Sequence, residues 1–398
     1  MKSRLGLDML IYVFSTLPLE QLSRCRLISK EWEKHIESVN FLRLYLARSD
    51  RMLLVLRKGQ KSSCCQIYKF LDEVNPAVKD NDDRRYVAQS RSVFPHPAEI
   101  LGSAGGLLLL IKVDDRLLHE NLFVWNPFFK YYFNLNHPPS LKSTTEATCY
   151  GFGVDNLLKR YKVVRILFSN DVPHSTSTVR GEVFTVGPEQ EQGWRVVQPV
   201  DGFTYNANEF GALVNGNLHW LVSDSDKKWM ISCFDIETEC FTTFSTPLCI
   251  KENKAFHGGV TVLNGRLCLH EIKDSNESHQ TAIWVLNNYN NHAEKEWKLE
   301  VVVDNDEEFG GFFTSYPRLT CYPLHLFAND DDVLMVGDLD ILYNYSKKTK
   351  RSSEIDIFRR NECYGIIHNP CYLSLKSIVG VEDPHITTIG ETDIDEDI

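Results

Sequence analysis

The sequence predicts an α+β protein, in which a small N-terminal unit of three helices precedes a mainly antiparallel, all-β repeat domain. Three observations support this: an apolar stripe at helical spacing in the first ~50 residues, a change to short β-rich runs after Lys61, and a hairpin pattern that returns every ~50–60 residues. With 398 residues, 43% hydrophobic and 24% charged, the chain can hold more than one ordinary globular domain. We place the helical unit at 1–50, the β-domain at 62–380 and an acidic, disordered tail at 381–398.

The predicted helices follow from apolar stripes that are interrupted by a proline. Asp8 lies early in the first helix, where a carboxylate is favourable, and Pro18 ends that helix and suits the first turn of the next. A third short turn runs from Glu33 to Val39, and the residues from Phe41 onward lead into the next unit. The two stripes consist of Leu7, Leu10, Ile11, Phe14 and Leu17, then Leu19, Leu22, Cys25, Ser29 and Trp32.

Helices of this size bury too little surface to be stable alone. Their excess apolar residues need a partner, so the unit is either a cap on the rest of this chain or a docking site for another protein. It is also basic, with twelve Lys/Arg and six Asp/Glu between Met1 and Lys61, whereas the whole chain has a net charge of −11. Nucleic acid and an acidic protein both fit such a module. Because nothing basic follows to extend a nucleic-acid track, we expect no nucleic-acid partner.

The order of residues in the helical unit is similar to that of one family. The matching residues are Leu5, Leu10-Ile11, Leu17-Pro18-Leu19, Leu22, Arg24-Cys25-Arg26, Ile28-Ser29-Lys30, Trp32, Ile36 and Phe41-Leu42. Together they resemble a plant-type F-box. The resemblance implies docking on a Skp-type adaptor, which is acidic, and the positive charge of the unit fits that implication.

The resemblance implies six adaptor-binding residues: Leu5, Leu10, Leu17, Pro18, Leu22 and Trp32. Trp32, like Ile36, is equally compatible with an internal core position. The family usually opens with Leu-Pro, whereas Leu5 is here followed by Gly6, and the effect of this departure on adaptor affinity stays open.

The β-domain is predicted from repeated hairpins. Asn215-Gly216 and Asn264-Gly265 each lie between two apolar runs, and both residues of an Asn-Gly pair tolerate the positive φ of a type I′ turn. Similar hairpin cores lie at Gly105-Gly106 and Asp331-Asp332. A period near 50 with about four strands per unit is typical of a kelch-like propeller, and about six units fit between Lys61 and Gly380. A pair of β-sandwiches is the alternative.

The repeat region also resembles a known domain over most of 100–300. The residues that carry the resemblance include Trp125-Asn-Pro, Tyr150-Gly-Phe-Gly-Val-Asp, Tyr161-Lys-Val-Val-Arg-Ile, Val214-Asn-Gly-Asn-Leu-His-Trp-Leu and Phe234-Asp-Ile. They are similar to the F-box-associated domain of large plant families, including the S-locus type, although Ala104-Gly105 stands where the family often has Cys-Asn. The resemblance implies the substrate-receptor subunit of an SCF-type ubiquitin ligase, connected to a cullin-RING ligase through the adaptor. It does not identify the target.

The cysteines and the N-terminus indicate the compartment. Eleven scattered cysteines with no CxxC motif suit reduced core thiols, so we expect the cytoplasm, the nucleus or both. Asp8 interrupts the apolar run that would otherwise resemble a signal peptide. No apolar stretch reaches the ~20 residues that span a bilayer, so we expect no membrane association.

The sequence contains no pattern that requires catalysis. GxSxG and HExxH are missing, and no third glycine follows Gly151-Phe-Gly153. We expect His219 and His270 to be packed or hydrogen-bonded rather than metal ligands, and the aromatic run from Tyr131 to Phe133 to pack in a strand rather than to stack on bases. We therefore expect a non-catalytic receptor with no metal and no cofactor. A propeller enzyme, such as a copper oxidase or a sugar-acting enzyme, and a scaffold without a ligase role remain alternatives. Candidate target-contact loops are Ser169–Thr178 and Asp274–Gln280.

Overall fold

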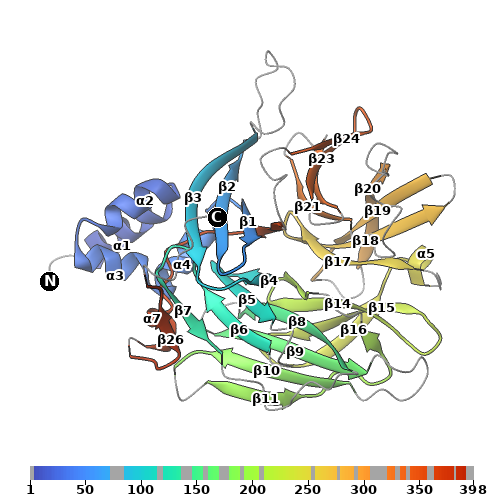
Figure 1. Cartoon of the computed structure of the whole chain (residues 1–398), viewed down its shortest axis with the longest axis horizontal. Coiled ribbons are helices and arrows are strands. Elements are labelled where there is room, and N and C mark those ends of the chain that lie inside the picture. Colours follow the sequence, from blue (N-terminus) through green and yellow to red (C-terminus); the bar gives the residue numbers. More distant parts are fainter. Residues whose placement is uncertain are drawn as a thin grey trace.

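The described part of the chain forms four N-terminal helices followed by six antiparallel sheets, which are the blades of a propeller (Figure 1). The predicted order of a helical unit and a mainly antiparallel β-domain is thus confirmed. The computed structural model describes residues 4–71, 85–113, 120–135, 146–155, 160–169, 179–188, 192–205, 210–251, 256–275, 278–290, 295–304, 321–327, 332–337, 341–355, 363–380 and 382–390.

The helices are α1 (Arg4–Ser15), α2 (Leu19–Arg26), α3 (Lys30–Ile36) and α4 (Val39–Leu46). Two serines cap the last two: the Ser29 hydroxyl accepts a hydrogen bond from the Trp32 amide at 3.2 Å, and the Ser38 hydroxyl accepts one from the Phe41 amide at 3.3 Å. The prediction of three helices missed α4, because its eight residues make only about two turns, too few for a helical period to stand out.

Each blade is one sheet whose inner strand lines the propeller axis. Blade 1 consists of β25 (Cys363–His368), β1 (Met52–Lys58), β2 (Ser63–Phe70) and β3 (Tyr86–Phe94). Blade 2 consists of β4 (Glu99–Ala104), β5 (Leu107–Val113), β6 (Glu120–Trp125), β7 (Tyr131–Asn134) and β26 (Ile386–Thr388). Blade 3 consists of β8 (Glu146–Val154), β9 (Tyr161–Ser169), β10 (Arg180–Val186) and β11 (Gly193–Val197).

The remaining three blades complete the ring. Blade 4 consists of β12 (Thr204–Tyr205), β13 (Ala212–Val214), β14 (Asn217–Ser223), β15 (Trp229–Asp235) and β16 (Phe241–Ser245). Blade 5 consists of β17 (His257–Leu263), β18 (Arg266–Ser275), β19 (Ser278–Asn287) and β20 (Glu296–Asp304). Blade 6 consists of β21 (Tyr322–Leu326), β22 (Asp332–Val336), β23 (Leu342–Ser346) and β24 (Arg351–Glu354). Two short helices, α5 (Leu248–Lys251) and α7 (Lys376–Val379), lie outside the blades.

The predicted Asn-Gly hairpins are confirmed. Asn215 and Gly216 have φ of 51° and 77°, and Asn264 and Gly265 have φ of 48° and 80°. Positive φ at both central residues is the requirement of a type I′ turn. These hairpins join β13 to β14 and β17 to β18, so each links the inner strand of a blade to its second strand.

The ring is closed in blade 1, where β25 from the end of the propeller sequence forms the inner strand beside β1, β2 and β3 from its beginning. In blade 1, β25 pairs antiparallel with β1, for example Leu54 with Ile366. The propeller therefore begins at Met52 and not at residue 62, as the domain prediction had it. The apolar run of β1 comes directly after the apolar helix α4 without a turn signal, so the sequence did not reveal the boundary.

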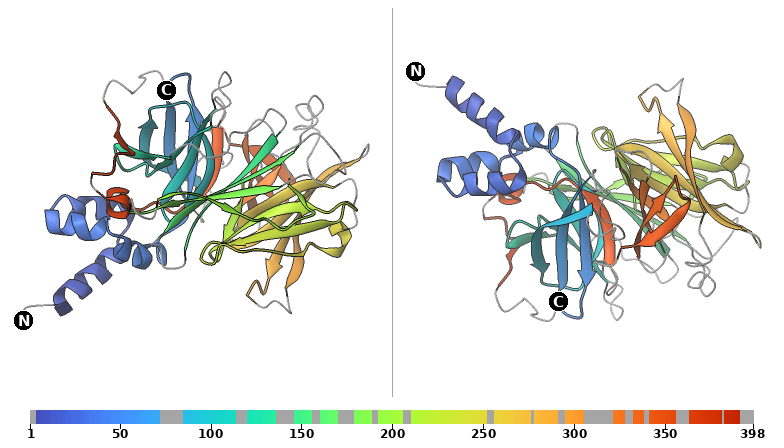
Figure 2. Two further views of the ribbon diagram at one scale, coloured as in Figure 1. Left: turned by 90° about the horizontal axis from the view of Figure 1, so that it is seen from below. Right: turned by 90° about the horizontal axis from the view of Figure 1, so that it is seen from above.

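The chain does not end at the closing strand. Residues 369–380 and 382–389 run back across blade 2, where β26 pairs with β7 (Figure 2). The prediction of a disordered tail at 381–398 is therefore wrong where β26 forms. Residues 391–398 lie outside the described residues. We call residues 369–380 and 382–389 the brace. None of the described helices is long and apolar enough to span a membrane.

Candidate functional site

The N-terminal helices have an inward face that belongs to a core shared with the propeller. One continuous cluster of buried residues includes side chains from these helices, from blades 2 and 3 and from the brace. The helix residues of this cluster are Phe14, Leu19, Leu22, Ile36, Phe41, Leu42 and Tyr45, and those of the brace are Cys371, Tyr372, Leu373, Leu375, Ile378 and Val379. The helices are thus packed on the rest of the chain through one face.

The same helices also expose apolar side chains on the outside. Met9, Tyr12 and Val13 follow each other at i, i+3 and i+4 on the exposed side of α1, and Leu27 and Ile28 lie between α2 and α3. Leu27 is 83% exposed. We call these five residues the outer apolar residues. Large exposed apolar side chains in one small module are typical of a protein-binding surface.

The structure places the six predicted adaptor contacts in different environments. Leu10 and Leu17 are half-buried against the shared core, and Pro18 is exposed at the start of α2. Trp32 is also half-buried, and its ring centroid lies 4.8 Å from that of Phe14 in an edge-on arrangement. The side chain of Leu5 lies outside the described residues.

Leu22 does not fit the prediction of a direct contact, because its exposed fraction is 0%. Its role is to fill the core beneath the helices. Conversely, sequence reasoning missed the outer apolar residues. Met9, Tyr12 and Val13 lie on the side of α1 opposite its inward stripe, and this second group of apolar residues at helical spacing is the signal that could have found them.

The basic residues of the module do not all face outward. The Arg24 side chain is 75% exposed and pairs with Glu20, whereas the Arg26 side chain is 19% exposed and donates from Nε to a Glu37 carboxylate oxygen at 2.7 Å. Burial raises the pKa of the Glu37 carboxyl, although the Arg26 guanidinium partly offsets this. Arg48 lies over the Tyr12 ring, 4.8 Å from its centroid. Only some of the module's positive charge is therefore available to an acidic partner.

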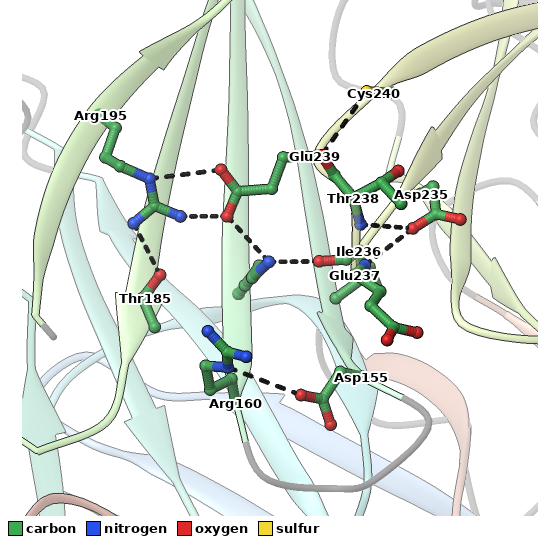
Figure 3. A network of polar contacts seen from close by, with 11 residues as sticks. Asp155, Arg160, Thr185, Arg195, Asp235, Ile236, Glu237, Thr238, Glu239 and Cys240 are labelled. Carbon is green, nitrogen blue, oxygen red and sulfur yellow. Dashed lines mark hydrogen bonds and ion pairs between the residues drawn. The ribbon is translucent and has the colours of Figure 1, made fainter.

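A polar network joins blades 3 and 4 near the β15–β16 turn (Figure 3). Glu239 receives hydrogen bonds from Arg195 and an ion pair from Lys162 at 2.8 Å, and the Lys162 ammonium also donates to the Ile236 carbonyl. Burial alone would raise the pKa of Glu239, but the hydrogen bonds from Lys162 and Arg195 outweigh it and lower that pKa. These contacts join strands β9 and β11 of blade 3 to the β15–β16 turn of blade 4, so the network connects the two blades.

A second network joins blades 2 and 3. The buried Arg165 lies 2.8 Å from a Glu120 carboxylate oxygen and 3.0 Å from one of Glu182, and the Tyr150 hydroxyl donates to Glu120 at 2.5 Å. Burial raises the pKa of Tyr150 well above its usual value, which keeps the hydroxyl protonated as a donor. These groups again satisfy one another.

The histidines singled out in the sequence lie in strands. His219 is buried, with Nδ1 2.9 Å from the Ala212 carbonyl and Nε2 2.7 Å from the Tyr289 hydroxyl, as expected for a hydrogen-bonded strand residue. Tyr132 and Phe133 are buried in β7, so the strand-packing expectation is confirmed there. Within the residues that the structure describes, no group of three His, Cys, Asp or Glu side chains could hold a metal ion.

Comparison with solved structures finds distant propellers. A fungal lectin from Aleuria aurantia with a six-bladed propeller is 10% identical, with a TM-score of 0.36 over 76% of this chain and 94% of the lectin. The propeller domain of a protease from Pyrococcus furiosus is 8% identical, with a TM-score of 0.35 over 78% of this chain and all (100%) of that domain. Likenesses this weak carry no argument about function.

Comparison with curated proteins and family models is more informative. An F-box/kelch-repeat protein of Arabidopsis thaliana is 26% identical over 291 residues, covering 72% of this chain and 73% of the relative. An F-box protein of the same plant is 24% identical over 301 residues, covering 71% and 69%. The F-box domain model matches residues 3–44, and the F-box associated beta propeller domain model matches 47–372. This chain therefore belongs to the family of F-box proteins with an F-box-associated β-propeller domain.

Proposed function

We propose that this protein is the substrate-recognition subunit of an SCF-type E3 ubiquitin ligase. An F-box implies binding to a Skp-type adaptor in general. In this proposal the F-box helices dock that adaptor, which connects the chain to a cullin-RING ligase, and the propeller captures a protein target. The observation that carries the proposal is the set of outer apolar residues on an F-box whose other face is already packed on the propeller.

The test is binding of the intact chain to a purified Skp-type adaptor. Replacing exposed Val13 and Leu27 by Asp places charges on the outer face, and we expect adaptor binding to weaken by at least ~100-fold, because burying an unpaired carboxylate costs several kcal/mol. Val196→Asp is the matched control: Val196 is 68% exposed on β11 of the propeller. Equal binding by the double variant and the control would contradict the proposal. These positions suit the test better than Leu17, because replacing a half-buried residue also disturbs the fold.

We propose that the target binds the propeller end opposite the helices. The helices and the brace lie at the end where inner strands turn into second strands, because Arg51, just before β1, lies beside Gly265, and Cys371 lies beside Gly106. Within each antiparallel blade the second strand turns into the third at the other end. The predicted loops Ser169–Thr178 and Asp274–Gln280 connect strands there, although their tips lie outside the described residues.

The alternative of a propeller enzyme predicts bound metal or turnover in the purified chain. Relatives named as F-box proteins favour a non-catalytic receptor, which is what we propose. The cytoplasm or nucleus is the compartment that we propose for this role, supported by the cysteines, eight of which are buried core thiols.

A further inference from the structure

The brace extends beyond both the ring closure and the match to the propeller family. That match ends at residue 372, whereas the brace continues through α7 and β26 to Ile389. Figures 1 and 2 show α7 next to the N-terminal helices and β26 at the outer edge of blade 2. A segment that is not needed to close the ring contacts both domains.

Asn126 anchors the brace to blade 2. Its exposed fraction is 0%, and its side-chain amide donates to the carbonyls of Cys371 at 3.0 Å and Leu373 at 2.8 Å. Its side-chain oxygen accepts from the Phe128 amide at 3.1 Å. One side chain thus satisfies two buried carbonyls of an irregular segment, which would otherwise cost free energy.

The next residues of the brace bind the end of α3. The amide of Ser374 and the hydroxyl of Ser377 both donate to the Glu37 carbonyl, at 3.3 Å and 3.1 Å. The Ser374 hydroxyl also lies 2.6 Å from the Tyr131 hydroxyl of β7. Because Glu37 follows α3 directly, these bonds satisfy a carbonyl that the helix itself leaves unpaired. The same brace residue therefore contacts an F-box helix and a propeller strand.

Arg26 makes the third connection. Its guanidinium carbon lies 4.9 Å from the ring centroid of Tyr372 in the brace and 5.2 Å from that of Phe129 in the β6–β7 turn. Its Nε donates to Glu37. A planar guanidinium can contact aromatic rings and a carboxylate at once, which an ammonium does less well. Arg26 belongs to the F-box sequence but faces the propeller.

The far end of the brace is held separately. Three residues of β26 pair with β7, the Ile389 amide donates to the Lys130 carbonyl at 2.8 Å, and Gln192 donates to Asp383 at 2.6 Å. With both ends anchored on the propeller, α7 has little freedom to leave the helices.

We infer that the brace fixes the orientation of the F-box relative to the propeller, and that Arg26 and Asn126 are positioning residues for that orientation. Domains joined by a short linker move relative to each other by default, unless a packed interface prevents it. This inference rests on the proposed function where it gives the brace a role in ubiquitin transfer. In that role the brace holds a target on the propeller at a set position relative to the adaptor.

The test measures the orientation directly in the full-length chain. Spin labels introduced as unnatural amino acids at the exposed positions Glu31 and Asp226 report the distance distribution between α3 and blade 4 by double electron–electron resonance. We expect R26A/N126A to broaden that distribution about twofold or more, and R26K, which keeps charge without planar stacking, to broaden it less. R24A/N344A is the matched control, since Arg24 is exposed on the same helix and Asn344 is a buried asparagine of blade 6.

Adaptor affinity separates this inference from the proposed function. We expect R26A/N126A to bind the adaptor within about threefold of the unaltered chain, because neither residue is an outer apolar residue. If the distance distribution of R26A/N126A is as narrow as that of the unaltered chain, the brace does not fix the orientation of the F-box, whether or not an adaptor binds. If the double variant does not fold, R26A alone carries the same expectation, since the Arg26 side chain retains some exposure. If the unaltered chain binds no adaptor, the proposed function fails, and the distance measurement still tests whether the brace fixes the orientation of the F-box.

Discussion

The F-box helices and the propeller differ in how completely they bury their apolar side chains. Of twelve large apolar side chains that are exposed within the described residues, six lie between Met9 and Leu44. The other six are spread over a propeller several times larger, whose inner strands and blade interfaces are filled. A closed ring satisfies itself, whereas a short helical module needs partners on both sides.

The difference also resolves the two interpretations of the helical stripe. The cap interpretation describes the inward face, which shares a core with blades 2 and 3 and the brace. The docking interpretation concerns the outward face, where Met9, Tyr12, Val13, Leu27 and Ile28 are exposed. Sequence periodicity detects apolar faces but does not say what covers each one.

Among single substitutions, the largest effect on stability should come from the inward face of the helices. Leu22→Ala removes a fully buried side chain and should lower the free energy of unfolding by about 2–5 kcal/mol. Leu27→Ala, at an exposed position of the same module, should change it by no more than about 0.5 kcal/mol. Urea unfolding of both variants checks this, and similar losses would mean that the two faces are not distinct.

Acid should weaken the propeller through its buried histidines. Burial lowers the pKa of His219 to about 4, of His270 to about 4 and of His368 to about 3, so the folded state favours the neutral rings. This stability is fully present above the ordinary histidine pKa of ~6.5, and it is lost progressively as pH falls from that value toward the lowered pKa values. Between pH 7 and pH 5 we expect about 2 kcal/mol of loss per histidine. His219→Gln should reduce the slope of unfolding free energy against pH; an unchanged slope would exclude His219 as a source.

The smallest effect concerns the cap of α3. Ser29→Ala removes the acceptor for the Trp32 amide and should cost about 1 kcal/mol, whereas Ser29→Asp retains an acceptor and should restore most of it. Hydrogen exchange of the first amides of α3 measures the change locally. If the Ala and Asp variants exchange equally fast, the hydroxyl does not stabilise the helix.

The parts of the fold that could be predicted were those with local signals. Asn215-Gly216 and Asn264-Gly265 require a particular backbone, and the structure has it. The start of β1 and the strand β26 were missed, because their pairing partners lie far away in the chain: β25 for β1, and β7 for β26. For the site, the F-box resemblance located the module, but Leu22 and Arg26 show that burial separates core and inter-domain residues from surface ones within one motif.

The pairing of β25 with β1 has a consequence for synthesis of the chain. Strand β1 cannot pair with its inner neighbour until residues 363–368 have been synthesised. The core of the helices cannot be completed until Leu375, Ile378 and Val379 have been added. Synthesis must therefore reach at least residue 379 before either domain can reach its final packing. The F-box helices are synthesised before the propeller but reach their final packing only after it, so a product that terminates within the propeller carries the docking sequence without the brace that completes its core.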